Sequence, residues 1–583
     1  MIRFLFFVVL VCAPWAAMGE PTQTPSAPAD APATPPAAAP STPADTASEA
    51  TPAPAVAEPE PAPTPKTDSV APAAAPVATP APAAPAASPA PAAPSKKPTT
   101  PLATQLAAKT NPSPTFFGDQ TLSLHFPMMA TYRFEDASAV TVDRDGNVSD
   151  PDGASNAQIR LGATFKAMPS KLTRFSVEYE HDVFAGQFAG GATGETELVH
   201  GPLEGETDDT MRRAFAKLRL GPVFFGGGFT MSHWGMGLLA NDGADGWAPG
   251  SAHFRDPRGG DRVRRGYVGL GPIPALDLLI MGGYDVVEGD DILLSDDTAE
   301  QFVGSVILQP GKPRTAGFYV AHRTQNHVGE KTTEVTIFDL YLNWTATLDS
   351  GLEFEGAFEG AVISGETGLG PNPDYPVHDV YQVGVAARAA LSAQRYGGVI
   401  DFFYGSGDRN LDDRELNAFR ADHNYELGML LFRHVVGAHS ARSPVRASDL
   451  ELVGVPPEDL DRLPSRGAAT NAWVIFPKGW FRTSYGLEVY GGPMLAFSDV
   501  EVIDPRNTRL AGGELRNGYD GQPGALLGTE FDLGLRYTTT LGGVGLTAGV
   551  EAAAFLPGSA FAGPDGETID AVYGARAMTR VEL

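Results

Sequence analysis

The sequence predicts an all-β protein, an antiparallel transmembrane β-barrel of about eighteen strands (sixteen as the alternative count), preceded by a disordered Pro/Ala-rich segment. Three observations lead to this fold class. Apolar and polar residues alternate along most of the chain, and short Gly/Pro turns alternate with long polar loops. Beyond the N-terminus, no segment holds the roughly 18 uninterrupted apolar residues of a membrane helix. Because only helices and closed barrels satisfy all backbone polar groups in hydrocarbon, a membrane location would require a barrel.

Residues 1–19 have the features of a secretory signal peptide. Arg3 supplies a positive charge, Phe4–Cys12 is an apolar run, and Ala17–Gly19 is a small-residue cleavage site. Cys12 is the only cysteine of the chain. We therefore expect no disulfide, thiolate metal site or cysteine nucleophile in the mature protein.

Residues 20–113 are rich in Pro, Ala and Thr and contain no aromatic residue. Such a composition cannot bury enough apolar surface to offset the entropy cost of ordering. We expect a disordered, semi-extended periplasmic tether, which either acts as a spacer or contacts peptidoglycan.

Residues 114–583 form the predicted outer-membrane barrel domain. In its last strand, Tyr573–Leu583, small and apolar residues alternate with Arg576, Arg580 and Glu582, as expected for one face against lipid and one against an aqueous lumen. The predicted strands are 120–134, 156–168, 172–182, 210–220, 222–231, 262–271, 275–284, 301–309, 314–322, 334–347, 351–363, 378–391, 395–405, 470–477, 483–497, 525–539, 542–556 and 569–583.

The predicted connections alternate in length. Short turns, among them Met168–Lys171, Pro310–Pro313 and Pro477–Gly479, separate longer polar loops, of which 406–469 is the longest. Short periplasmic turns opposite long external loops are typical of bacterial outer-membrane barrels. An even number of strands also leaves both termini on the periplasmic side.

The charge balance argues against a nucleic-acid partner. The net charge is −28, and the chain beyond residue 113 carries 37 of the 42 basic and 63 of the 70 acidic residues. Phosphate binding requires a basic surface, which this composition does not provide. The predicted partners are instead outer-membrane lipid and small hydrophilic solutes.

Strand parity gives a set of charged residues that we expect to face the lumen. They either select and orient solutes or neutralise one another across neighbouring strands. The lumen or constriction candidates from parity are Arg160, Lys166, Arg174, Glu178, Lys217, Arg219, Glu353, Glu355, Arg388, Glu530, Asp532, Arg536, Arg576 and Arg580. Arg264 is a further candidate, among the basic residues that follow the apolar loop 232–243.

The loop after the fifth predicted strand adds His233 and Trp234 to these candidates. Its run Ser232–Gly243 is unusually apolar for an external loop, and a water-exposed apolar loop would be a liability. It either folds inward as a constriction or plug, or its apolar side chains pack against the inside of the wall. A second apolar run, Tyr425–Phe432, is either a further strand or an inserted helix.

The sequence contains no strong catalytic or metal-binding motif, and we expect neither a cofactor nor a metal. Asp408–Asp413 has the spacing of a calcium loop but lacks its central glycine, so a solvated acidic turn is favoured. The adjacent Ser232 and His233 have no assigned acid partner, and an enzyme is not expected.

The run His233–Gly243, with Asp261–Val263 downstream, resembles an uncharacterised family of outer-membrane barrels of the myxobacterial type. Its members have a signal peptide, a Pro-rich leader and an H-W-G-x-G motif. Gly405–Asp408, Asn417–Phe419 and His423–Tyr425 are loosely similar to an external loop of alginate-export and related porins. The resemblance implies a porin-like architecture and no particular substrate.

These observations predict a porin-like channel in the outer membrane of a Gram-negative bacterium, passing hydrophilic or anionic solutes, saccharides among them, by passive diffusion. The alternative is a plugged structural or surface-binding barrel that is attached to the cell wall. An outer-membrane hydrolase is the third possibility.

Overall fold

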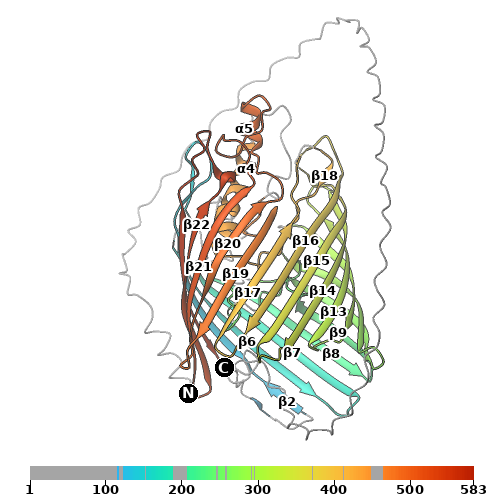
Figure 1. Cartoon of the computed structure of the whole chain (residues 1–583). Coiled ribbons are helices and arrows are strands. Elements are labelled where there is room, and N and C mark those ends of the chain that lie inside the picture. Colours follow the sequence, from blue (N-terminus) through green and yellow to red (C-terminus); the bar gives the residue numbers. More distant parts are fainter. Residues whose placement is uncertain are drawn as a thin grey trace, which may run out of the picture. The chain divides into compact units, whose positions relative to one another are not determined.

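The computed structural model describes residues 115–116, 122–150, 153–187, 207–244, 247, 249–255, 259–290, 292–293, 296–370, 372–410, 413–447 and 464–583. The predicted signal peptide and Pro/Ala-rich tether, 1–113, lie outside these residues. The described chain is a closed antiparallel β-barrel (Figure 1). Its main sheet contains 21 strands, of which β1, β2 and β18 are short additions, so that eighteen strands form the wall.

The described strands and helices have the following bounds: β1 Thr115–Phe116, β2 Leu122–His125, β3 Met128–Ala137, β4 Val140–Thr141, β5 Val148–Ser149, β6 Ala154–Ala167, β7 Thr173–Gln187, β8 Thr207–Leu220, β9 Val223–Met231, β10 Arg262–Ile273, β11 Leu278–Gly289, β12 Thr298–Leu308, β13 Arg314–Asn326, β14 Thr332–Thr347, β15 Glu353–Thr367, β16 His378–Ser392, β17 Tyr396–Gly405, β18 Glu415–Leu416, η1 Leu431–Val436, α4 Gly437–Ala447, β19 Ala472–Arg482, β20 Leu487–Ser498, α5 Pro505–Leu510, β21 Leu526–Leu541, β22 Val544–Pro557, η3 Ser559–Phe561 and β23 Val572–Glu582.

The barrel closes between its first and last wall strands. Gly574 to Glu582 of β23 pair antiparallel with Ala137 to Met129 of β3, without a register shift. Every other wall strand pairs with its neighbours in the chain, so the wall has no free edge along its length. Closure satisfies the backbone groups that an open sheet would leave unpaired, as a bilayer requires. The predicted fold class and the count of eighteen strands are confirmed.

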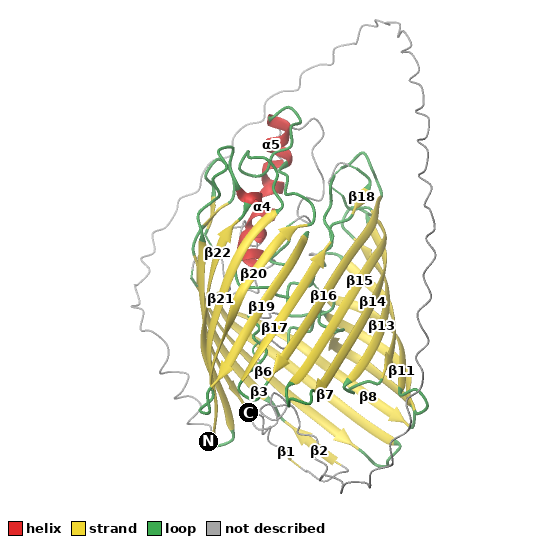
Figure 2. Cartoon of the chain, in the orientation of Figure 1, coloured by secondary structure: helices red, strands yellow, loops and turns green. Residues whose placement is uncertain are grey.

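The two ends of the barrel differ in their connections (Figure 2). Short links such as Gly221–Pro222 and Gly542–Gly543 join strands at the end that also holds the C-terminus, which we call the turn end. The long connections, including 232–261 and 406–471, lie at the opposite, loop end. The predicted alternation of short and long connections is therefore present.

One predicted turn is wrong. Pro477–Gly479 lies within β19, and the chain turns only at 483–486. Pro477 stands opposite Pro493 of β20, and the pairing of β19 with β20 is interrupted between Ile475 and Gly479. Because proline has no N–H to donate, the two prolines interrupt the ladder locally without ending either strand.

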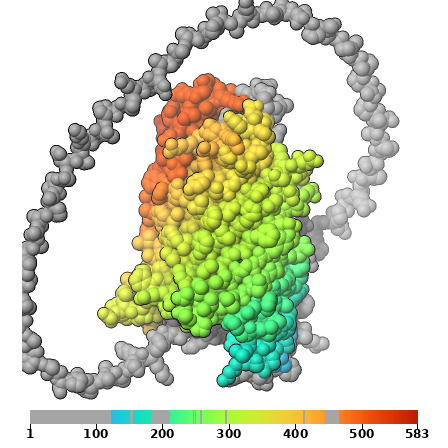
Figure 3. All heavy atoms as spheres, turned by 90° about the vertical axis from the view of Figure 1, so that its right-hand side faces the viewer, coloured from blue at the N-terminus to red at the C-terminus, as the bar shows by residue number. Residues whose placement is uncertain are grey.

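The outer face of the wall is apolar. Side chains at alternate strand positions point outward and are exposed, as the series Phe531, Leu533 and Leu535 illustrates. Figure 3 shows the outside of the wall over strands coloured green and yellow as a continuous surface. Such a surface suits hydrocarbon, since exposed apolar area of this extent is a liability in water. Among the described residues, no helix is long and apolar enough to cross a bilayer.

The inside of the barrel holds a buried apolar core on one side. It joins inward residues of the wall, such as Phe403, Phe476 and Phe555, to residues of the loops 232–261 and 406–471. The predicted inserted segment near Tyr425–Phe432 is not a wall strand. It leads directly into η1 and α4.

Candidate functional site

Two loops fold into the lumen and define the candidate site. The first inner loop, the described part of 232–261, connects β9 to β10, and the second inner loop, the described part of 406–471, connects β17 to β19. They contact each other where the N–H of Asp422 donates to the carbonyl of Leu238 at 2.8 Å. The first inner loop therefore lies inside the barrel, a position common to both arrangements that its apolar sequence allowed, and Trp234 packs against the wall at Gly317 and Tyr319.

Carboxylates of the wall hold the start of the first inner loop. The indole Nε1 of Trp234 donates to Asp339 on β14 at 2.9 Å, and its ring lies 5.2 Å from that of Tyr319 on β13. Fully buried Glu359 on β15 accepts the N–H groups of Met236 and, at 3.3 Å, Leu238. A buried carboxylate that accepts backbone N–H groups satisfies both partners where water is excluded.

The second inner loop is attached in the same way on the far side of the lumen. Buried Glu530 on β21 accepts three successive backbone N–H groups, from Met429 at 2.5 Å, Leu430 at 2.9 Å and Leu431 at 2.8 Å. These N–H groups lie at the start of η1, where no intrahelical carbonyl is available to them. Asp532 is buried two residues further along the same inward face.

The later part of the first inner loop crosses to strands β16–β22. Trp247 Nε1 lies 3.2 Å from Glu551 of β22, and the N–H of Gly250 donates to Glu488 of β20 at 3.0 Å. The guanidinium of Arg388 on β16 donates to the carbonyl of Ser251 and faces His253 Nε2. The loop thus contacts opposite sides of the barrel.

The wall beneath this crossing is a network of buried ion pairs. Asp401 accepts from Arg388 at 3.0 Å and from Lys478 at 2.6 Å. Arg536 is fully buried, pairs with Glu488 at 2.6 Å and lies 4.6 Å from the ring centre of Tyr490. Such charges are tolerated only because each has an opposite partner close by.

His253 is the titratable group of the loop within this network. Burial and the positive charges of Arg388, Arg255, Lys478 and Arg536 hold the pKa of His253 well below its ordinary value. The imidazole is therefore neutral at neutral pH and its Nε2 accepts from Arg388.

A different arrangement lines strands β6–β8, which we call the charge ladder: Arg160, Glu178, Glu180, Asp182, Arg212, Arg213 and Lys217. Asp182 pairs with Arg160 at 2.7 Å, and Glu178 pairs with Lys217 at 2.9 Å. The Lys217 side chain is 45% exposed, in contrast to the fully buried Arg536. The Glu178–Lys217 pair of the charge ladder is therefore in contact with water.

Arg212 of the ladder also fixes the base of the first inner loop. It pairs with Glu180 at 2.8 Å and donates to the carbonyl of Gly259 at 2.6 Å and to that of Asp242. A register shift between Glu180 and His181 of β7 leaves Arg212 of β8 without a partner residue in the pairing of the two strands. Simple alternation misses Arg212 because this bulge brings two successive arginines to the inward side.

The remaining candidates from strand parity are placed as follows. Lys166, Arg174, Glu353 and Glu355 lie on the inward face near the turn end, where they are less buried than their neighbours further along the strand. Arg219 donates to the carbonyls of Gly221 at 2.9 Å and Gly271 at 2.8 Å, so it holds two turns together.

Arg576 and Arg580 lie on the inward face of β23. Arg576 pairs with Glu551 at 2.5 Å, and Arg580 lies 4.0 Å from Glu582. Both positions agree with the predicted parity of the last strand. Arg576 extends the buried ion-pair network of the β16–β22 wall to its neighbour β23.

Two candidates differ from their predicted surroundings. Arg264 points to the outside of the barrel: its side chain is 54% exposed and pairs with Glu288, while the neighbouring Arg265 faces inward and binds Asp285 at 2.7 Å. Arg264 has the same strand parity as the exposed Val268 and Leu270, so simple alternation along β10 places it outside. His233 is half-exposed and lies 3.4 Å from Asp242.

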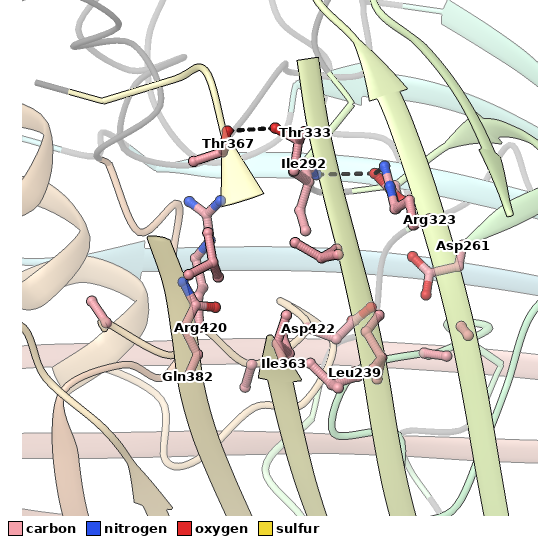
Figure 4. Close-up of a pocket in the computed structure, with 18 of the residues that line it drawn as sticks. Leu239, Asp261, Ile292, Arg323, Thr333, Ile363, Thr367, Gln382, Arg420 and Asp422 are labelled. Atoms are coloured by element: carbon pink, nitrogen blue, oxygen red, sulfur yellow. Dashed lines mark hydrogen bonds and ion pairs between the residues drawn. The ribbon is translucent and has the colours of Figure 1, made fainter. Parts of the chain in front are cut away.

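A cavity of about 400 Å³ remains between the inner loops and strands β10–β16. Figure 4 shows Thr333 and Thr367 at one end of it, joined by a hydrogen bond, and Leu239 and Ile363 at the other. Arg420 and Gln382 lie across from Arg323 and Asp261. Sequence analysis missed this cavity, because its lining residues come from seven wall strands and four connections between them.

Comparisons with known proteins identify similar solved structures only. No protein-family model matches the sequence, and a comparison with curated proteins finds no match, so the resemblance at the H-W-G-x-G run stays a prediction. OccK5 (OpdH) of Pseudomonas aeruginosa has 10% sequence identity and a TM-score of 0.45, covering 79% of this chain and 98% of that chain. OccK2 (OpdF) of the same organism has 11% identity and a TM-score of 0.45, covering 79% and 97%. OccK2 has also been solved in complex with glucuronate, with a TM-score of 0.44 to this chain. At these values, the likeness carries no argument about function.

Proposed function

We propose that this protein is a porin-like channel of the outer membrane of a Gram-negative bacterium, through which small solutes diffuse. The observation that carries the proposal is the division of the lumen into two halves. The two inner loops fill the side of β16–β23, whereas the charge ladder on β6–β8 keeps charged side chains in contact with water. A barrel of about eighteen strands is wide enough to leave such a passage beside an inward loop.

The charge ladder favours hydrophilic solutes along this route. Its basic groups, such as Arg213 and Lys217, stand opposite Glu178 and Glu180 at distances of 2.9 to 3.8 Å. A passing solute can replace one partner of such a partly solvated pair at a low cost in free energy, because an ion pair in contact with water contributes little stability. The ladder can therefore contact anionic groups and hydroxyl groups alike.

Planar-bilayer recording of the purified full chain tests the proposal. We expect discrete current steps in potassium chloride from protein that retains the heat-sensitive gel mobility of a folded barrel. Folded protein that inserts and yields no current would contradict the channel function.

A second candidate function is a plugged structural barrel, and the extensive buried core inside the lumen favours it. It requires a closed lumen and a contact between residues 20–113 and peptidoglycan. In that case folded protein would give no current, and the full chain would sediment with purified peptidoglycan whereas a chain lacking 20–113 would not.

A further inference from the structure

We propose that the cavity between the inner loops and β10–β16 is a binding site for small, uncharged amphipathic molecules with an aromatic or branched hydrocarbon body. This inference goes beyond the proposed channel function, because the cavity lies on β10–β16 and the charge ladder lies on β6–β8. The cavity volume of about 400 Å³ lies within the range of small-molecule sites in proteins.

The wall of the cavity is more apolar than the wall of an ordinary aqueous lumen. Inward positions of a channel barrel are expected to be polar. Here many of them carry branched aliphatic side chains: Val263, Val287, Val335, Ile337, Ile363 and Val380. Val263 and Val287 come from β10 and β11 and the other four from β14, β15 and β16, so two apolar patches line the cavity, with Gln301 of β12 and Tyr319, Ala321 and Arg323 of β13 between them.

An aromatic pair belongs to the lining of the cavity. Trp234 of the first inner loop and Tyr319 of β13 both line the cavity, with ring centres 5.2 Å apart. A Cβ atom at Gly317 would come within 2.9 Å of the Trp234 ring, so the absence of a side chain there lets the indole lie against the wall. A flat hydrocarbon ring would find an aromatic face on which to stack.

Two groups of polar side chains at the cavity are bonded to one another. Arg323 pairs with Asp290 at 2.5 Å and donates to Gln325 at 2.7 Å. Thr333 and Thr367 bond to each other at 2.5 Å. Since these groups are already satisfied, a charged solute would have to displace an existing partner.

Gln382 is the position that we assign to a ligand's head group. It lines the cavity from β16 and takes part in no described hydrogen bond, and Arg420 lies beside it, across the cavity from Asp261 (Figure 4). One or two hydrogen-bonding groups on a ligand could be satisfied there. The ring of hydroxyls on a saccharide could not be, because most of them would face Val and Ile side chains without a partner.

Quenching of tryptophan fluorescence tests the site independently of conduction. The probe is 4-nitrobenzyl alcohol, an uncharged aromatic alcohol that quenches indole on contact, added to the full chain in liposomes. We expect saturable quenching in the wild type and only linear collisional quenching in Trp234→Phe. We expect 2-phenylethanol to compete with the probe and glucose not to compete at the same concentration.

Matched variants assign the binding to the aliphatic wall. The double variant Val335→Thr with Ile337→Thr keeps β-branched side chains but adds hydroxyls to the cavity, and we expect the half-saturating probe concentration to rise roughly tenfold. Val399→Thr makes the same exchange at a buried inward position of β17 outside the cavity, and should leave binding unchanged.

Three outcomes would overturn the inference: equal linear quenching in the wild type and Trp234→Phe, displacement of the probe by glucose, or unaltered affinity in the double variant. None of them depends on ion current. Saturable quenching in a folded barrel that gives no current would contradict the channel function and support the binding site. Current from a barrel that shows no saturable quenching would support the channel function and contradict the binding site.

Discussion

The indole Nε1 of Trp234 donates a hydrogen bond of 2.9 Å to the carboxylate of Asp339, which joins the first inner loop to the inward face of β14. This bond holds a large ring against the inward face of β13 and β14, where it lines the cavity. The position of the ring depends on contacts from three strands, β13, β14 and β15.

Replacing Trp234 should widen the passage. In Trp234→Ala the ring and its bond to Asp339 are both lost, so we expect a larger single-channel conductance than in the wild type. Trp234→Phe keeps most of the ring and removes only the donor, and should change conductance less. Bilayer recording checks both variants, and equal conductance in Trp234→Ala and the wild type would show that the ring does not limit the passage.

The carboxylate of Glu530 should contribute strongly to the stability of the second inner loop. In Glu530→Ala, the N–H groups of Met429, Leu430 and Leu431 lose their acceptor inside the barrel. Each buried N–H without a partner costs about 1–3 kcal/mol, so we expect a loss of at least about 3 kcal/mol in the free energy of unfolding or of loop release.

Hydrogen exchange measures this effect directly. The amides of 429–431 should exchange faster in Glu530→Ala than in the wild type. Glu514→Ala, at a carboxylate that is 59% exposed, serves as the control and should change neither exchange nor unfolding. Unchanged protection of 429–431 in Glu530→Ala would mean that the loop is held by its apolar packing alone.

Much of the barrel was predictable from the sequence because strand geometry has a period of two. Lys217, Glu530 and Arg536 face the lumen as parity predicts, and the long and short connections separate to opposite ends. Strict alternation places Arg264 outside with Val268, and it became a candidate only because it belongs to a run of arginines after the apolar loop. Parity misses Arg212 because a register shift in the pairing of β7 with β8 brings it inward. That shift gives no signal in the residue pattern.

The candidate site was predictable only in part. The apolar run containing Trp234 indicated an inward loop, but its partners Asp339 and Glu359 are more than 100 residues away in the chain. Nothing in the spacing of Trp247 pointed to Glu551. Contacts across a lumen join residues from many strands, and sequence alternation describes each strand separately.

Removing positive charge from the charge ladder should shift ion selectivity toward cations. In the double variant Arg213→Gln with Lys217→Gln, Glu178 and Glu180 lose basic partners on the water-exposed part of the wall. The reversal potential across a potassium chloride gradient should move toward the potassium equilibrium potential. Lys312→Gln removes a charge from a turn, at a side chain that is 59% exposed, and should produce a smaller shift. Equal shifts would place the ion route away from the ladder.

Acidification should loosen the first inner loop through His253. In the docked loop its pKa lies well below 6.5, while a released loop has a pKa near 6.5. As pH falls through about 6.5, the released loop binds a proton at His253 that the docked loop does not bind, so docking of the loop weakens. Above about pH 6.5 His253 is neutral in both forms, and the docked loop keeps its full stability. The groups that face His253 are Arg388, Arg255, Lys478 and Arg536, with Asp401 beside them.

Hydrogen exchange of amides 250–254 at pH 7.5 and at pH 5.5 measures this dependence, after correction for the intrinsic rate at each pH. Protection should decrease in the wild type at the lower pH. His253→Asn, which does not titrate, should show the same protection at both. A wild type with constant protection would mean that contacts of Trp247 and Gly250 hold the loop regardless of the imidazole.

The apolar belt makes a depth-dependent prediction about lipid contact. Leu533 and Leu541 lie on the same outward face of β21, Leu533 in the middle of the strand and Leu541 at its turn end. If hydrocarbon covers this face, Leu533→Arg should lower the free energy of unfolding by about 2–4 kcal/mol and Leu541→Arg by about 0–1 kcal/mol, because a charge is costly only deep in the bilayer. Guanidine titration of protein folded into liposomes measures both losses. Equal and small losses would indicate that water covers the belt, since the Leu533 side chain is already 60% exposed and leaves no cavity when replaced.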